Sequence, residues 1–251
     1  MFSGVFRAIV MHGKGSPRDS EPLPNEGRST VHDDLAASRE TMVERQLIAR
    51  GIAEPCILNA MRRVPREAFL SPDLRAWAYA DAALPIEAGQ TITQPFMVAR
   101  MLQAARLKPE DRVLEIGTGS GYAAAVLAEM VARVDTVERH PQLAESAMDR
   151  LRALGYDNVN VHTADGTLGL PARAPFDAIV ATASGPGVPP AWSAQLEIGG
   201  RIVMPVGPDP DHQRLIRLTR DSSTTYHEEM LDLVRFVPLI GAQGWGDTGG
   251  R

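Results

Sequence analysis

The sequence predicts an α/β domain in which a mostly parallel sheet carries helices on both faces, preceded by a small helical layer. Over residues 108–128, a charged turn leads into a short apolar run that ends in alternating glycines and continues into an alanine-rich segment. This order is typical of a buried parallel strand, a glycine turn and a helix. The chain then alternates strand-like and helix-like segments, which indicates a doubly wound sheet. For 251 residues we expect one large domain.

Charge and composition exclude several function classes. The formal net charge of -5 argues against a general nucleic-acid binder, which would show a basic patch. Cys56 is the only cysteine, so an intrachain disulfide is impossible and a reducing compartment is expected. The 6 histidines are scattered without metal-ligand spacing, and no apolar run approaches the roughly 18 residues of a membrane span. We therefore expect no metal site and no membrane partner.

Residues 1–37 are expected to form a disordered lead. Residues 12–37 are rich in glycine, proline, serine and charge, and they hold too little apolar surface to offset the entropy lost on ordering. The single folded domain is expected over residues 38–245, with a helical layer and a loop in 38–105 and the sheet in 106–245. The glycine-rich residues 246–251 are expected to form a loose tail.

Two amphipathic helices are predicted at the start of the folded part. The first stops at Gly51, and its apolar stripe consists of Met42, Val43, Leu47 and Ile48. The second lies between Pro55 and Pro65, with apolar residues at i, i+3, i+4 and i+7: Ile57, Ala60, Met61 and Val64. Residues 67–79 are expected to be helical or irregular, with three side chains packing inward: Phe69, Leu74 and Trp77.

Residues 83–96 (ALPIEAGQTITQPF) show no sustained hydrophobic period and are expected to form a loop. Pro95 suits the first position of the helix that follows, so Thr93 or Gln94 is the expected N-cap. The apolar face of that helix is Met97, Val98, Met101, Leu102 and Ala105.

The glycine turn is the clearest candidate binding element. Gly117, Gly119 and Gly121 alternate with Thr118 and Ser120, a spacing that differs from the G-x-G-x-x-G of dinucleotide folds. Glu115 precedes the first glycine by two residues. An acid there would repel a pyrophosphate but would suit a cationic amino-acid ligand, such as the methionine part of S-adenosylmethionine. A purely structural glycine turn is the alternative.

Predicted strands and helices continue to alternate through the rest of the chain. The predicted strands and helices are 134–138, 141–154 (helix), a strand starting at 159–161, 176–182, 192–196 (short helix), 201–206, 214–219 and 230–237. The last two strands have no helix between them and should pair in antiparallel fashion.

Four loops should meet at the carboxyl edge of the sheet, where open α/β sheets bind ligands. They carry the glycine turn, Glu138 with Arg139, Asp165 with Gly166, and residues 182–187. We expect the glycines to bind the amino-acid end of a nucleoside ligand, Glu138 the ribose and Asp165 an adenine amino group. A plain Asp-Gly turn is the alternative for Asp165.

At this point the sequence resembles the protein-L-isoaspartate O-methyltransferase family, which methylates isoaspartyl residues in aged proteins. The resemblance covers roughly residues 39–245 and is carried by MVERQL (42–47), VPRE-F (64–69), ALPI--GQTI-QPF (83–96), VLEIGTGSGY (113–122), TVER (136–139), LGYDNV (154–159), DG--G-P--APFDAI (165–179), GGR-V-PVG (199–207) and VRFVPL (234–239). It implies a Rossmann-like methyltransferase sheet, S-adenosylmethionine as donor, isoaspartyl proteins and peptides as substrates for repair, and a cytoplasmic monomer.

One departure concerns the loop. The family usually reads Thr-Ile-Ser where this chain has Thr91, Ile92 and Thr93, so the hydroxyl is kept and a methyl group is added. A substrate carboxylate of pKa about 4 is ionised at neutral pH and needs no general base to attack a sulfonium methyl. We therefore predict that Thr93 positions the carboxylate, with Ile92, Gln94 and Phe96 shaping the site. Thr93 as a mere helix cap is the alternative.

Three rival functions remain open at this stage. A specialised peptide or small-molecule carboxyl methyltransferase would share the nucleoside site but use the loop for another acceptor. A non-catalytic module would bind S-adenosylmethionine without transfer. A nicotinamide-dependent dehydrogenase is disfavoured by the glycine spacing.

Overall fold

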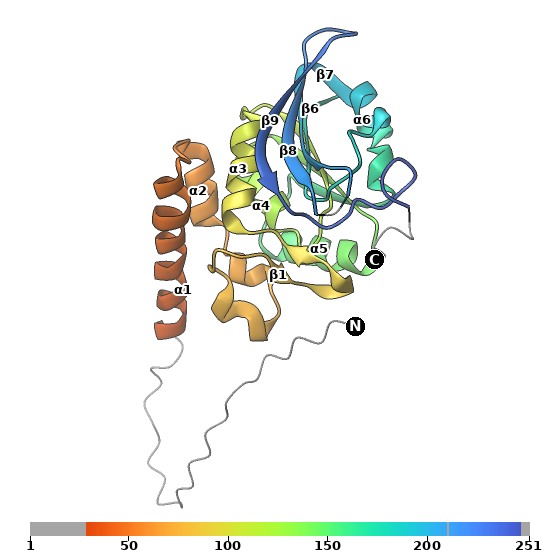
Figure 1. Cartoon of the computed structure of the whole chain (residues 1–251). Coiled ribbons are helices and arrows are strands. Elements are labelled where there is room, and N and C mark those ends of the chain that lie inside the picture. Colours follow the sequence, from red (N-terminus) through yellow and green to blue (C-terminus); the bar gives the residue numbers. More distant parts are fainter. Residues whose placement is uncertain (1–28, 210, 247–251) are drawn as a thin grey trace, which may run out of the picture.

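The computed structural model describes residues 29–209 and 211–246. Its centre is a 7-stranded sheet in the order β5-β4-β3-β6-β7-β8-β9. Strands β6 to β9 are labelled in Figure 1. The strands are β3 (Arg112–Ile116), β4 (Arg133–Glu138), β5 (Val159–Thr163), β6 (Phe176–Ala181), β7 (Leu196–Val206), β8 (Gln213–Arg220) and β9 (Tyr226–Val234). All pairs from β5 to β7 are parallel, whereas β8 pairs antiparallel with both its neighbours. The predicted α/β class and its antiparallel edge are confirmed.

Helices cover both faces of the sheet. They are α1 (Ser29–Met42), α2 (Pro55–Arg63), α3 (Pro95–Ala105), α4 (Tyr122–Ala128), α5 (Pro141–Ala153) and α6 (Pro190–Gln195). On β3, Val113 packs into one apolar cluster with side chains of α2, α3 and α4, while Leu114 packs into a second cluster with Trp192 of α6. Successive residues of a strand point to opposite faces of the sheet. Val113 and Leu114 are therefore both buried because helices cover both faces.

The helical layer begins earlier than the sequence predicts. We expected the folded part to start near Ser38, but α1 begins at Ser29; residues 1–28 lie outside the described residues. Two contacts fasten α1: Leu35 packs against the first apolar cluster, and the Arg39 side chain donates hydrogen bonds to Tyr79 Oη and Glu67 Oε1. The composition of residues 12–37 as a whole does not reveal the helical residues 29–37. Their apolar and alanine residues are outnumbered by the polar residues before them.

Two apolar side chains expected inside are exposed instead. Ile48 is 45% exposed because the helix changes to a π-type turn over Val43–Leu47, which rotates the residues after Leu47 off the buried stripe. Trp77 is 62% exposed at the end of a short 3₁₀ helix (Pro72–Trp77), and its neighbours Ala78 and Tyr79 are buried in its place.

The segment expected to be a loop contains a small hairpin. Strands β1 (Leu84–Pro85) and β2 (Thr91–Ile92) pair antiparallel, with Leu84 opposite Ile92. The turn between them places Ala88 in the left-handed region at φ 56°. Strands of two residues are too short to show the alternation that predicts a strand.

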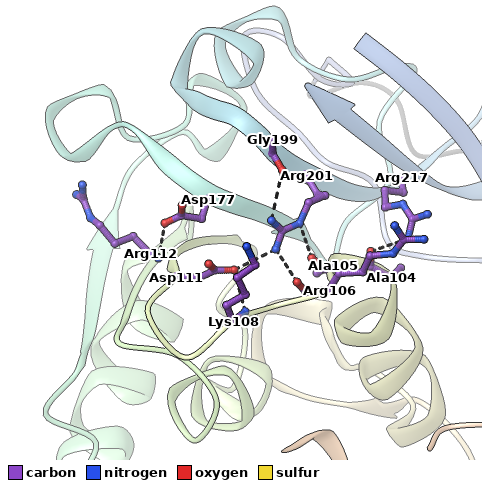
Figure 2. A network of polar contacts seen from close by, with 10 residues as sticks. All are labelled: Ala104, Ala105, Arg106, Lys108, Asp111, Arg112, Asp177, Gly199, Arg201 and Arg217. Carbon is purple, nitrogen blue, oxygen red and sulfur yellow. Dashed lines mark hydrogen bonds and ion pairs between the residues drawn. The ribbon is translucent and has the colours of Figure 1, made fainter. Parts of the chain in front are cut away.

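Helix α3, which follows this hairpin, is fixed to the sheet at its carboxyl end (Figure 2). Arg201 on β7 donates from Nε to Ala105 O at 2.6 Å and from Nη2 to Arg106 O at 2.8 Å, and it pairs with Asp111 at 3.0 Å. Arg217 on β8 donates to Ala104 O at 3.1 Å. These cations satisfy carbonyls left without partners at a helix end and match its negative dipole.

Candidate active site

The glycine turn after β3 adopts a backbone that side chains would strain. Gly117, Gly119 and Gly121 have φ angles of 93°, 53° and 90°. A Cβ on Gly117 would lie 2.8 Å from Thr182 Oγ1. The turn is tied to the next strand, because the amides of Gly117 and Thr118 donate to Val137 O at 2.9 and 3.3 Å. This turn leaves room for a ligand against its backbone.

Glu138, at the end of β4, holds the same turn from the side. Its Oε2 accepts a hydrogen bond from Gly119 N at 2.9 Å, and its Oε1 accepts one from His140 N at 3.0 Å. The residue is 5% exposed and lines a pocket beside the glycine turn. Each oxygen keeps a second lone pair, so the carboxylate can still accept hydrogen bonds from a ligand in the pocket.

This pocket, of about 110 Å³, lies at the carboxyl edge of the sheet, and we name it the main pocket because it borders the glycine turn. Its lining residues are Gln90, Thr91, Ile116, Gly117, Gly119, Val137, Glu138, Arg139, His140, Gly166, Thr182, Ala183, Val237, Pro238, Leu239 and Ile240. The pocket thus brings together several predicted residues: Gly117, Gly119, Glu138, Arg139 and Gly166.

The residues after β9 were not predicted to line this pocket. They cross back over the sheet, because Ser184 N donates to Val237 O at 2.8 Å and Leu239 N donates to Ser184 O at 2.7 Å. Trp245 Nε1 also donates to Ser184 O, at 2.9 Å. The only sequence signal for this wall was the VRFVPL stretch of the family resemblance.

Asp165 lies beside the main pocket rather than in its wall. Its Oδ1 accepts from Thr167 N at 2.9 Å and from the Thr167 hydroxyl at 2.6 Å, and its Oδ2 accepts from Ala242 N at 2.8 Å. Burial alone would raise the pKa of Asp165, but these hydrogen bonds outweigh it and lower the pKa. Asp165 therefore fastens the carboxyl-terminal segment to the loop after β5.

We expected Glu115 to lie beside the ligand, but its side chain lies beneath the glycine turn. The residue is fully buried and lines none of the pockets of the described residues. Its Oε2 accepts from the Thr136 hydroxyl at 2.5 Å, which lies 2.7 Å from the Thr118 hydroxyl. Burial raises the pKa of Glu115 to about 8. The carboxyl group supports the turn through the hydroxyls of Thr136 and Thr118. It does not reach the surface because β3 lies in the middle of the sheet.

A second, smaller hollow joins the glycine turn to the β1–β2 hairpin. It is lined by Thr91, Ile92, Thr93, Val98, Gly117, Thr118, Gly119, Ser120, Tyr122, Ala123 and Thr182. Thr93 and Ile92 therefore share one hollow with the turn, as predicted. Gly121 lies outside both hollows, where a Cβ would meet Ala147 of α5 at 3.3 Å.

Gln94 and Phe96 also lie outside both hollows. Gln94 is the N-cap residue of α3 by position, but its side chain makes no capping hydrogen bond and its Nε2 donates to Asp81 Oδ1 at 2.6 Å. Across residues 29–209 and 211–246, the Thr93 hydroxyl has no hydrogen-bond partner. Thr93 is thus not a helix cap, and its hydroxyl is free to contact a ligand.

The described part of the chain offers neither a cluster of metal ligands nor a membrane-spanning helix. It contains no group of three or more histidine, cysteine, aspartate or glutamate side chains placed to hold a metal ion. It also contains no helix with both the length and the apolar character needed to cross a membrane.

The sequence of the chain is similar to those of known enzymes. The family model for protein-L-isoaspartate(D-aspartate) O-methyltransferase (PCMT) matches residues 37–244. The protein-L-isoaspartate O-methyltransferase of Rhodopseudomonas palustris (strain ATCC BAA-98 / CGA009) is 57% identical over 204 residues, covering 81% of this chain and 94% of the relative. Protein-L-isoaspartate O-methyltransferase 2 of Pelobacter propionicus is 55% identical over 207 residues, covering 82% and 92%.

Solved structures agree with the sequence relatives. One protein-L-isoaspartate O-methyltransferase superposes with a TM-score of 0.74 at 30% identity, covering 82% of this chain and 67% of that one. A beta-aspartate methyltransferase (PCMT) of Plasmodium falciparum, crystallised in complex with S-adenosyl-L-homocysteine, superposes with a TM-score of 0.70 at 25% identity, covering 80% and 98%.

Proposed function

The chain belongs to the protein-L-isoaspartate(D-aspartate) O-methyltransferase family, and from this premise we propose how its own residues carry out the reaction. The enzyme transfers a methyl group from S-adenosylmethionine to the free carboxylate of isoaspartyl residues in damaged proteins and peptides. The comparisons leave open which side chains contact the donor and the acceptor.

The donor side is assigned to the glycine turn and the strand ends around it. The site fits S-adenosylmethionine because Gly117 and Gly119 present bare backbone to the pocket, and because Glu138 is buried and lines the same pocket. The donor supplies a methyl group on a positively charged sulfur. We assign Gly117–Ser120 to its amino-acid end, Glu138 and Arg139 to its ribose, and Asp165 with Gly166 to its adenine. Gly121 and Glu115 support the turn from outside the pocket.

The acceptor side is assigned to residues 84–96, which we name the acceptor loop. Thr93 donates a hydrogen bond from its hydroxyl to the isoaspartyl carboxylate, and Ile92, buried beside it, forms the floor of the hollow. Because that carboxylate is already ionised at neutral pH, the enzyme needs orientation and exclusion of water rather than a base. The observation that carries this assignment is that Thr93 and the glycine turn line one hollow.

We further propose that the enzyme acts as a monomer in the cytoplasm. The single cysteine, which suits a reducing compartment, and the family resemblance support this proposal. The acceptor is a polypeptide, and the net charge of -5 gives no reason to expect nucleic acid as a partner.

The test is methyl transfer to a matched pair of peptides. Purified protein is incubated with labelled S-adenosylmethionine and either an isoaspartyl peptide or its normal aspartyl twin, and base-labile methyl ester is counted. We expect ester on the isoaspartyl peptide only. Equal labelling of both peptides would contradict the proposed recognition, and labelling of neither would favour a specialised relative with another acceptor.

A further inference from the structure

Four side chains that lie outside both hollows are connected to one another around the start of α3. Arg50, Asp81, Gln94 and Phe96 form this cluster, which we name the Arg50 latch. We propose that the latch holds the acceptor loop in the conformation that receives the peptide, so that it sets the affinity for the acceptor and not for the donor. This inference rests on the proposed function of the loop.

The contacts of the latch form a closed circuit. Arg50 Nη1 lies 3.1 Å from Asp81 Oδ2 and 3.3 Å from Asp81 Oδ1. Asp81 then accepts from Gln94 Nε2, through Oδ1 at 2.6 Å and through its backbone oxygen at 3.2 Å. The Arg50 guanidinium also lies over the Phe96 ring, 3.4 Å from its centroid. Gln94 and Phe96 are thereby fastened on either side of Pro95, directly after Thr93.

The latch is exposed, so its loss should change the conformation of the loop more than the stability of the whole domain. The side chains of Arg50 and Asp81 are 41% and 45% exposed, and an ion pair in such a position adds little to global stability. It can still bias a surface loop between a competent and an incompetent conformation. If the loop is competent for only a fraction of the time, the apparent affinity for the acceptor falls by that fraction, while the rate of the bound complex is unchanged.

The donor side should not be affected by the latch. None of its four residues lines the main pocket or the smaller hollow, and the glycine turn is held by separate bonds to Val137 and Glu138. A general loss of packing would weaken both ligands together, whereas loss of the latch should weaken the peptide alone.

The test compares Arg50→Met with Arg63→Met. Arg63 also forms a surface ion pair, 3.2 Å from Glu129, so it is a matched control away from the acceptor loop. We expect Arg50→Met to raise KM for an isoaspartyl peptide about fivefold, with kcat and the Kd for S-adenosylhomocysteine within about twofold of wild type. Arg50→Lys, which restores the charge but not the flat contact with Phe96, should lie between the two.

Hydrogen exchange gives a readout that does not depend on turnover. The amides of Ile86 and Val98 donate within and just after the acceptor loop, and they should exchange faster in Arg50→Met than in Arg63→Met. The inference is overturned if loop exchange and peptide KM match the control, or if S-adenosylhomocysteine affinity falls by the same factor as peptide affinity. Failure of the proposed function would appear separately, as absence of transfer by the wild-type enzyme.

Discussion

On the proposed donor side, the glycine turn is held by a buried carboxylate and by the next strand, whereas on the proposed acceptor side the start of α3 is held by exposed side chains. On the donor side, Glu138 accepts the amides of Gly119 and His140 from a buried position. On the acceptor side, Gln94 and Phe96 are held by Arg50 and Asp81 at the surface. The donor is one molecule that needs one fixed shape, while damaged residues arise in many polypeptides. The difference teaches that one side is held by contacts inside the sheet and the other by surface contacts between residues far apart in the chain.

The largest expected effect comes from adding a side chain to the glycine turn. Gly117→Val would force φ 93° on a β-branched residue and bring its Cβ to 2.8 Å from Thr182 Oγ1. We expect S-adenosylhomocysteine affinity, measured by calorimetry, to fall at least about 100-fold. Gly155→Val shares the left-handed backbone at φ 83° but meets nothing within 4 Å, so it should lose stability without losing affinity. Equal affinities would disprove the close approach of the ligand to the turn.

A smaller loss on the same side is expected for Glu138→Gln. The amide group can accept only one of the two backbone hydrogen bonds and presents a donor to the other amide. Loss of a charged hydrogen bond corresponds to about 10- to 100-fold in the Kd for S-adenosylhomocysteine. Glu145→Gln, on the exposed face of α5, is the control and should bind as wild type does. An unchanged Kd for Glu138→Gln would remove this residue from the donor site.

Burial of Glu115 should make stability depend on pH. Since its pKa is raised from 4.5 to about 8, the folded protein holds this proton more tightly than the unfolded chain does. The contribution is present at low pH and is lost as the pH rises towards about 8, at no more than about 1.4 kcal/mol per pH unit. Urea unfolding of wild type and Glu115→Gln between about pH 5 and pH 8 checks this, because the variant cannot titrate. A constant difference between the two proteins would show that Glu115 stays ionised.

The smallest expected effect lies in the acceptor loop. Ala88 adopts φ 56°, a conformation that costs an alanine about 1–2 kcal/mol and glycine almost nothing. Ala88→Gly should therefore raise the free energy of unfolding by about 0.5 kcal/mol, after the larger entropy of the unfolded glycine is subtracted. Urea unfolding measures this change. A clear loss of stability would show that the methyl group of Ala88 makes contacts that outweigh the strain.

The same contrast explains how much could be predicted from the sequence. On the proposed donor side, the sequence indicated Gly117, Gly119 and Glu138, which line one pocket in the fold. Alternating glycines after an apolar run and an acid at the next strand end are local patterns with a direct chemical reason. The difference from the prediction concerns depth. Glu115 is buried beneath the turn, and Asp165, just after β5, lies beside the pocket and accepts hydrogen bonds from Thr167 and Ala242.

The acceptor side was predicted less well because its contacts join distant parts of the chain. Thr93 was found through the family resemblance, but the hairpin around it has strands of two residues and no readable period. Arg50 and Asp81 are 31 positions apart, and Arg201 meets the end of α3 across 96 positions. No local pattern relates such residues, so their partners became visible only in the fold.

The most direct test of the division between the two sides is Thr93→Val, measured for methyl transfer and for donor affinity in the same preparation. We predict that kcat/KM for an isoaspartyl peptide falls at least about tenfold while the Kd for S-adenosylhomocysteine stays within about twofold, and that Thr93→Ser, which keeps the hydroxyl, transfers nearly as wild type does. Transfer by Thr93→Val at a near wild-type rate, or a loss of donor affinity equal to the loss of transfer, would contradict this account.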